Sequence, residues 1–169
     1  MRPVSASVAI DAPRERVFAF VGDLANRPAF LEPFVTEYRL ERLDSAGVGA
    51  AARFRIAEDG TWMETVIEEV DAPRMIRERG RAGRVGRIPV FAVWELTEGI
   101  APGGCEVRVT YWTEPRSIFD RLRDHRPGAA RFYRQSWTGA LRRLRTLMEE
   151  ELEVMRVAVA GGDRVPGAG

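Results

Sequence analysis

Two glutamates in the segment Thr61–Asp71, Glu64 and Glu68, are candidates for proton-transfer chemistry. Polar and apolar residues alternate along this segment, which is typical of a strand with two different faces. Glu64 and Glu68 share one face with Trp62, Val66 and Val70, while Met63, Thr65, Ile67 and Glu69 form the other. The alternation leaves open which face is internal. An internal Glu64 or Glu68 could act as a general acid or base, whereas external glutamates would be solvated and paired with arginine.

Aromatic side chains form the second group of candidates. Trp94 and Trp137 lie on the periodic faces of a predicted strand and a predicted long helix. These surfaces would meet across a cavity, where aromatic rings could hold an apolar ligand and their polar tips could orient it. Filling the core is the simpler role for any one ring. The candidate ligand-binding residues are Trp62, Trp94, Tyr111, Tyr133, Trp137 and Leu141, and Tyr133 is also a candidate for acid–base assistance.

Arginine supplies all 26 basic residues, so chemistry that needs an amine, such as a Schiff-base or P-loop lysine, is excluded. Arg53, Arg55, Arg77 and Arg79 could bind a ligand carboxylate or, more simply, pair with glutamates on an outer sheet face. Nine arginines against two aspartates between residues 116 and 145 could dock a membrane surface or a carrier protein. The net charge of +1 gives no reason to expect nucleic acid.

Histidine and cysteine are too few for several kinds of site. One histidine, His125, and one cysteine, Cys105, rule out a His/Cys metal cluster and an internal disulfide, so neither a metal nor another cofactor is expected. A Ser-His-Asp arrangement would have to use His125, which stands at a predicted helix break. Gly80, Gly83 and Gly86 do not lie between a strand and a helix, so they predict no dinucleotide site.

The elements that must position these residues follow from periodicity. Alternation predicts strands over Val4–Ile10, Thr36–Asp44, Ala50–Glu58, Thr61–Asp71, Met75–Ala82, Ile88–Glu98 and Cys105–Thr113. Short connections, such as the Asp59-Gly60 turn, predict antiparallel neighbours. Two short helices should follow the first strand, capped by Asp11 and Asp23. Helical spacing predicts a short helix over Ser117–Asp124 and a long amphipathic one from about Ala129 to Met155.

The chain is predicted to form one domain over residues 1–155, followed by a Gly- and Pro-containing tail over residues 156–169. Within the tail, Val157-Ala158-Val159 could add an edge strand. Neither a signal-type apolar run nor the ~20 apolar residues of a membrane helix is found, so a cytoplasmic location is expected.

Several local motifs resemble one family. They are Val8-Ala9-Ile10-Asp11-Ala12-Pro13-Arg14-Glu15-Arg16-Val17-Phe18, then Val21, Asp23, Asn26, Pro28 and Phe30, followed by Val70-Asp71-Ala72-Pro73-Arg74-Met75, Trp94-Glu95-Leu96 and Gly103-Gly104-Cys105-Glu106-Val107-Arg108-Val109-Thr110. With the order of elements, they resemble the START/SRPBCC superfamily and, within it, the polyketide cyclase/dehydrase and lipid-transport group. The resemblance implies an α+β helix-grip fold: a seven-stranded curved antiparallel sheet around the C-terminal helix.

This resemblance carries little information about activity, because its motifs are capping, turn and core positions. The leading expectation is binding or transport of a small hydrophobic molecule, such as a lipid, isoprenoid, quinone or aromatic polyketide, between sheet and helix. The enzymatic alternative is a polyketide cyclase/dehydratase that folds its substrate with help from Glu64 or Glu68, arginine or Tyr133. A third alternative is a regulatory module that uses the Arg-rich helix on a protein or membrane.

Overall fold

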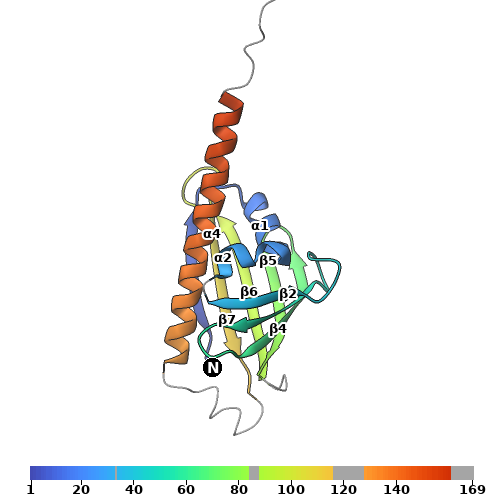
Figure 1. The fold of residues 1–169 in the computed structure, drawn as a ribbon. Coiled ribbons are helices and arrows are strands. Elements are labelled where there is room, and N and C mark those ends of the chain that lie inside the picture. The colour runs from blue at the N-terminus through green and yellow to red at the C-terminus, as the bar shows by residue number, and fades with distance from the viewer. Residues whose placement is uncertain (33, 84–87, 116–127, 161–169) are drawn as a thin grey trace, which may run out of the picture.

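A computed structural model describes residues 1–32, 34–83, 88–115 and 128–160, with side chains described as far as residue 150. The elements follow in the order β1 (Val4–Ile10), α1 (Arg14–Gly22), η1 (Leu24–Asn26), α2 (Pro28–Leu31), β2 (Val35–Leu40), β3 (Ala51–Ile56), β4 (Trp62–Asp71), β5 (Met75–Ala82), β6 (Ile88–Glu98), β7 (Cys105–Thr113) and α4 (Ala129–Ala160). This is the predicted α+β architecture (Figure 1).

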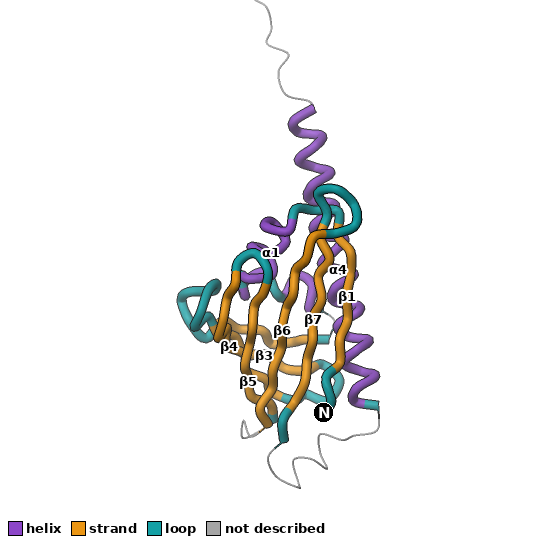
Figure 2. Tube along the Cα trace, turned by 180° about the vertical axis from the view of Figure 1, so that it is seen from behind, coloured by secondary structure: helices purple, strands orange, loops and turns teal. Residues whose placement is uncertain are grey.

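The strands form one antiparallel sheet in the order β1-β7-β6-β5-β4-β3-β2. Neighbours from β2 to β7 are consecutive in sequence because short connections join them, and β1 closes the far edge by pairing with β7, with Val4 opposite Tyr111. The sheet curls, so that β2 crosses in front of the middle strands (Figure 1). Figure 2 shows the other face, where the strands lie in front of the helices. The sheet therefore has a concave face that the helices cover and a convex face without a helix among the described residues.

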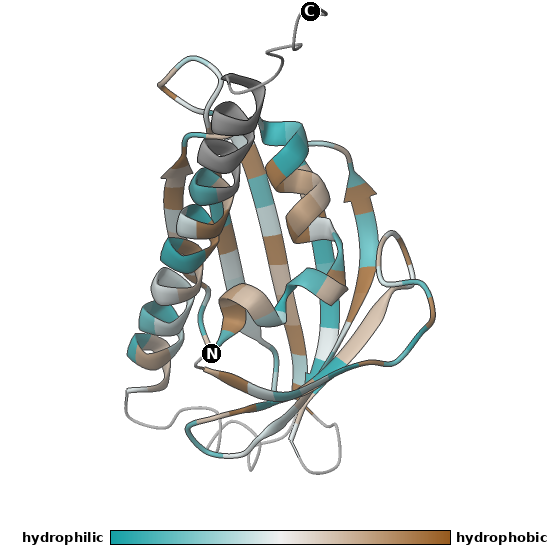
Figure 3. Cartoon of the chain, turned by 45° about the horizontal axis from the view of Figure 1, so that its top comes forward, coloured by the Kyte–Doolittle hydropathy of each residue, from teal (hydrophilic) through white to brown (hydrophobic). Residues whose placement is uncertain are grey.

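Helix α4 packs lengthwise on the concave side of the sheet, beside β1. Its buried residues recur at helical spacing: Trp137, Ala140, Leu141, Leu144 and Met148. Hydrophilic residues occupy the other side of the helix (Figure 3), as an amphipathic helix against a core requires.

Four strands, β1, β5, β6 and β7, have the predicted bounds, while β2 is shorter than predicted. A bulge interrupts its pairing with β3 between Thr36 and Arg39, and Glu37 at the bulge has a φ of 51°. The predicted strand over Thr36–Asp44 continued through residues that are loop. Asp44, at its predicted end, is exposed.

The helix ends also differ from prediction. Helix α1 begins after Pro13, without a side-chain cap, while the Asp11 backbone N–H donates to Glu149 of α4 over 3.1 Å. Asp23 does cap η1, as predicted, by accepting from the Ala25 backbone N–H over 2.9 Å. Helix α4 continues to Ala160, so Val157-Ala158-Val159 are helical and do not form an edge strand.

Candidate functional site

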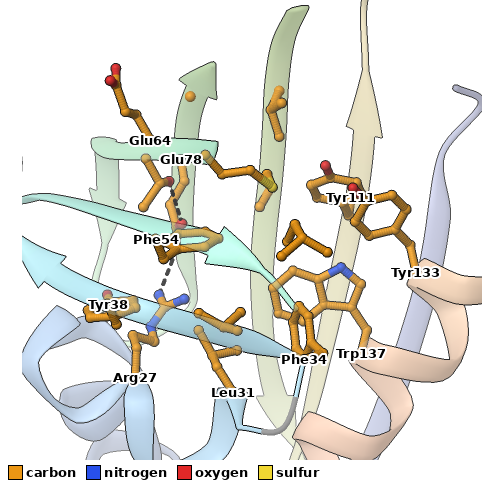
Figure 4. A pocket seen from close by; sticks show the side chains of 17 residues that line it. Arg27, Leu31, Phe34, Tyr38, Phe54, Glu64, Glu78, Tyr111, Tyr133 and Trp137 are labelled. Atoms are coloured by element: carbon orange, nitrogen blue, oxygen red, sulfur yellow. Dashed lines mark hydrogen bonds and ion pairs between the residues drawn. The ribbon is translucent and has the colours of Figure 1, made fainter. Parts of the chain in front are cut away.

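A cavity lies between the concave face of the sheet, the short helices and α4 (Figure 4). It has a volume of about 40 Å³. Its walls come from η1–α2, from β2 to β7 and from α4, and they are mostly apolar. A space of this size holds only a few water-sized groups. The cavity is therefore an inner chamber rather than a complete pocket for a large ligand.

Arg27 and Glu78 form a buried ion pair at one end of this inner chamber. Arg27 Nη2 donates to Glu78 Oε1 over 2.6 Å, and the side chains are only 3% and 6% exposed. The other carboxylate oxygen, Oε2, accepts from the Thr65 hydroxyl over 2.8 Å. Because each charge neutralises the other, the pair can remain ionised away from water. This end of the chamber is polar but carries no net charge.

Arg27 stands where η1 meets α2, and two further contacts fix its guanidinium. Its Nε donates to the Val21 carbonyl at the end of α1 over 2.8 Å. The guanidinium also lies over the Trp94 ring, 4.4 Å from the centroid, in cation–π geometry. The short helices thus deliver one half of the ion pair and the sheet delivers the other.

Strand β5 turns Glu78 inward through strict alternation. Ile76, Glu78, Gly80 and Ala82 are buried, while the arginines between them are exposed. At Gly80 the backbone of β4 comes so close that an added Cβ would lie 1.9 Å from the Glu64 carbonyl oxygen. Gly80 is therefore required for β4 and β5 to approach beside Glu78.

Tyr38 reaches the chamber because of the bulge in β2. Val35 and Tyr38 both line the cavity although they are three residues apart, which regular alternation would not allow. The Tyr38 ring stacks on Phe54, with centroids 5.6 Å apart. Its buried hydroxyl has no hydrogen-bond partner among the described residues. Burial raises the pKa of this hydroxyl, against the opposing effect of the Arg27 charge, so it remains a protonated donor.

Aromatic rings form the opposite end of the inner chamber. Trp137 of α4 packs edge-on against Phe34 and Trp94, each at 5.4 Å between centroids. Tyr111 of β7 and Tyr133 of α4 stack at 4.7 Å. The indole nitrogen of Trp137 lies on the ring edge turned toward these tyrosines (Figure 4), and it has no hydrogen-bond partner among the described residues.

A larger open groove continues from this aromatic end. It has a volume of about 600 Å³ and shares Ile56, Tyr111 and Tyr133 with the inner chamber. Glu58 and Asp59, from the turn between β3 and β4, are among the residues that line it. Chamber and groove together fall in the range of about 300–1,000 Å³ that small-molecule sites occupy.

The structure brings together three of the predicted ligand-binding residues. Tyr111, Tyr133 and Trp137 line the chamber. Trp94 and Leu141 are fully buried but do not line it. Trp94 contacts Trp137 directly, so the two rings do not face each other across a space. Trp62 lies elsewhere, on the convex face, where the guanidiniums of Arg53 and Arg55 are 4.5 and 5.1 Å from the centroid of its ring.

The predicted catalytic glutamates point away from the chamber. On β4 the internal face is that of Met63 and Ile67, which are 4% and 1% exposed. The Glu64 carboxylate projects away from the chamber (Figure 4), although the residue borders the chamber. Glu68 is exposed and lies 3.4 Å from Arg79. Arg77 pairs with Glu69 over 2.7 Å and Arg55 with Glu37 over 2.8 Å, as in the simpler interpretation of these arginines.

The sequence patterns assign no functional role to Arg27 or Glu78, the residues at the polar end of the site. The alternation of β5 carried a usable signal, because Glu78 is the one acidic residue that shares a face with Ile76, Gly80 and Ala82. The sequence pattern gives no comparable indication that Tyr38 lines the chamber, because alternation does not reveal the bulge in β2.

Other predicted features lie partly outside the described residues. His125, the helix predicted over Ser117–Asp124 and four of the nine arginines fall in residues 116–127, and Gly86 falls in residues 84–87. Arg131, Arg134 and Arg142 on α4 are exposed. Within the described chain, no group of three His, Cys, Asp or Glu side chains is placed to hold a metal ion. None of its helices combines the length and apolarity that crossing a membrane would need.

A family profile described as polyketide cyclase/dehydrase and lipid transport matches residues 1–149. The chain belongs to this family. The match covers every strand and most of α4, so it includes the whole cavity. Among curated protein sequences, none matches the chain significantly.

Solved structures share the fold at low sequence identity. The KanY protein is 18% identical with a TM-score of 0.66, over 87% of this chain and 97% of that chain. TTHA0849 from Thermus thermophilus is 21% identical with a TM-score of 0.63, over 95% and 99%. DynU16, from the dynemicin biosynthetic locus, is 19% identical with a TM-score of 0.60, over 88% of this chain and 48% of that chain. At these identities the likeness establishes the fold, which is compatible with ligand-binding and cyclase roles in general.

Proposed function

We propose that this protein binds a small, largely apolar molecule between the curved sheet and α4, either to carry it or to present it to a partner. The observation that carries the proposal is the aromatic inner chamber that continues into a groove of about 600 Å³. Apolar walls with a few placed polar groups are typical of small-molecule sites. Membership of a family that includes lipid transport supports the same function.

The ligand would enter through the groove, with its body against Tyr111 and Tyr133. Its inner end would reach Trp137 and the neutral Arg27–Glu78 pair. Transfer of apolar surface from water to these walls contributes about 25 cal/mol per Å², so even a two-ring compound gains several kcal/mol before the cost of association.

A cyclase/dehydratase role is the second candidate, and the polar end of the chamber favours it. A cyclase needs at least one polar group in contact with its substrate, and Tyr38, Arg27 and Tyr133 all line the chamber. Glu78 is less suited to proton transfer, because both of its carboxylate oxygens already accept hydrogen bonds. In this role the protein would mainly fold the substrate, with tyrosine and arginine polarising its carbonyl groups.

Calorimetric titration with a panel of lipids, quinones and polyaromatic compounds tests the binding function. We expect saturable binding by the wild-type protein, weaker binding by Tyr133→Ala, whose ring is only half-buried, and unchanged binding by Trp62→Ala. Trp62 is the matched control because its ring lies on the convex face. If no compound shows saturable binding, this proposal fails. The arginines of α4 would then be tested for docking on anionic vesicles or a carrier protein.

A further inference from the structure

We infer that Glu78 sets the charge of the ligand that the inner chamber accepts. By neutralising Arg27, the Glu78 carboxylate makes the chamber a site for an uncharged head group, such as a ketone or an ester, and disfavours a carboxylate. The inference rests on the proposed ligand binding and adds the chemical class of the ligand's inner end. It makes Glu78 a specificity-determining residue, a role separate from its contribution to stability.

Both members of the ion pair border the space that a ligand would fill. Arg27 and Glu78 line the chamber and face each other among its side chains (Figure 4). Arg27 Nε donates to the Val21 carbonyl, and Nη2 donates to Glu78 Oε1. The third guanidinium nitrogen, Nη1, has no acceptor among the described residues, yet, unlike Arg53 Nε, it is not sealed inside the protein. Its N–H groups can therefore donate to a ligand oxygen in the chamber.

The charges in the chamber are already balanced. Glu78 Oε1 lies 2.6 Å from Arg27 Nη2, and among the described residues the one other acidic or basic side chain that lines the chamber is Glu64, whose carboxylate points away. A ligand carboxylate would lose its hydration without meeting a cation that lacks a counter-ion, which is unfavourable in a buried site. A neutral oxygen has less hydration to lose and still receives the hydrogen bond from Nη1.

The substitution Glu78→Gln separates the charge from the hydrogen bonds. The amide oxygen can still accept from Arg27 Nη2, and the amide nitrogen can donate to the Thr65 hydroxyl, which is the present partner of Glu78 Oε2. Arg27 then becomes a buried cation without a counter-ion, and a ligand carboxylate would supply the missing charge. We therefore expect the preference of the chamber to move from uncharged toward anionic head groups.

Three naphthalenes with compact head groups of similar shape test this inference: 2-acetylnaphthalene, 2-naphthoate and 2-isopropenylnaphthalene. They carry a ketone, a carboxylate and a hydrocarbon group. In calorimetric titrations wild type should bind the ketone tightest. In Glu78→Gln the ratio of carboxylate to ketone affinity should rise roughly tenfold or more. In thermal melts 2-naphthoate should raise the melting temperature of Glu78→Gln more than that of wild type.

Glu68→Gln is the matched control. It makes the same chemical change at an exposed position, where Glu68 lies 3.4 Å from Arg79, so its affinity ratios should equal those of wild type. A Glu78→Gln chain that is too unstable to fold alone should recover its circular dichroism spectrum when 2-naphthoate is added, but not when the ketone is added at the same concentration.

A double variant, Arg27→Met with Glu78→Met, tests the donor. Apolar side chains of similar volume often replace a buried ion pair without loss of stability. Without the Nη1 donor, the ratio of ketone to hydrocarbon affinity should fall roughly three- to tenfold, the value of one net hydrogen bond.

The outcomes separate the two proposals. If the ketone binds but Glu78→Gln shows neither the change in ratio nor the recovery by 2-naphthoate, the role of Glu78 is overturned while ligand binding stands. Equal binding of carboxylate and ketone by wild type would also overturn it, and an unchanged ratio in the double variant would overturn Arg27 as the donor. If none of the three compounds binds, this inference is wrong, and the proposed function fails with it only if the wider panel of lipids, quinones and polyaromatic compounds also shows no saturable binding.

Discussion

At the scale of single residues, the Arg27–Glu78 ion pair differs from the other ion pairs described above in how deeply it is buried. The other ion pairs described above, such as Arg79–Glu68, are about half exposed, and exposed pairs contribute between 0 and about 1 kcal/mol. Arg27 and Glu78 are almost fully buried. Arg27 also contacts the Val21 carbonyl and the Trp94 ring, and Glu78 accepts a hydrogen bond from Thr65. Loss of one member would therefore leave the other charge buried without a partner, and this is the main way in which the pair affects stability.

Replacement of Glu78 should show this asymmetry. Glu78→Ala leaves the Arg27 charge buried without a partner, so we expect the free energy of unfolding to fall by about 3–5 kcal/mol. Glu68→Ala removes a glutamate from the same sheet at an exposed position and should cost less than about 1 kcal/mol. Urea denaturation of both variants measures the difference. Equal midpoints would show that the pair is not buried as described.

Cys105 gives a pH-dependent prediction. Burial raises the pKa of its thiol to about 11, above the usual value for an unfolded chain. Well below about pH 8.5, the usual pKa of a cysteine thiol, this thiol is protonated in both the folded and the unfolded chain, so it has little effect on stability. Between pH 9 and 11 the unfolded chain releases this proton more readily, so the free energy of unfolding should decrease as pH rises. Urea midpoints from pH 8 to 11 should fall less steeply in Cys105→Ala, and parallel curves would contradict the prediction.

At the scale of elements, α4 should depend on the face that it turns to the sheet. Leu144 is fully buried, so Leu144→Ala should cost about 2–5 kcal/mol. Arg142 on the outer side is exposed, and Arg142→Ala should change stability by no more than about 0.5 kcal/mol. Chemical denaturation provides the comparison. A larger loss of stability in Arg142→Ala than in Leu144→Ala would contradict the assignment of Leu144 to the buried face of α4.

Gly139 offers a stabilising change in the same helix. Nothing lies within 4 Å of the position that an added Cβ would take, and glycine inside a helix costs about 0.5–1 kcal/mol relative to alanine. Gly139→Ala should therefore raise the melting temperature. Gly80→Ala, whose Cβ would meet the backbone of β4, should lower it sharply, and an unchanged melting temperature would show that β4 and β5 do not approach so closely.

Alternation along the sequence located most strands because one face of the sheet is buried and the other is not. It failed at β2, where the bulge at Glu37 changes the side to which the following residues point. It also could not orient β4, because Trp62 and Val66 look as apolar as Met63 and Ile67. Packing decides the matter: arginine side chains cover Trp62 on the convex face, and their long apolar stems make such cover favourable.

At the scale of the whole molecule, the candidate site exists only when helices and sheet are assembled. Arg27 comes from the turn between η1 and α2, Tyr38 from β2, Glu78 from β5 and Trp137 from α4. Residues on opposite sides of the chamber are therefore far apart in the sequence. Patterns in local sequence therefore predicted the scaffold and the aromatic end, but not the polar end, which depends on contacts between distant residues.

Ligand binding should stabilise the assembled state as a whole. A compound that binds only the folded protein adds about 2.7 kcal/mol to the free energy of unfolding at one hundred times its Kd. Thermal melts in the presence of a compound that binds in the calorimetric titration should therefore shift upward with concentration, and Tyr133→Ala should shift less. A melting temperature independent of concentration would contradict the proposed site.

The pairing of β1 with β7 has a consequence for synthesis on the ribosome. The first strand to be made finds its partner last, since Val4 pairs with Tyr111 and α4 then packs on the same strand. A chain grows at about 5–20 residues per second, so several seconds pass while β1 has no neighbour. The exposed residues Ser5 and Ser7 of β1 are polar, which limits the apolar surface that the nascent chain exposes before β7 is synthesised. Folding of the domain can thus be completed only after β7 and α4 have been synthesised.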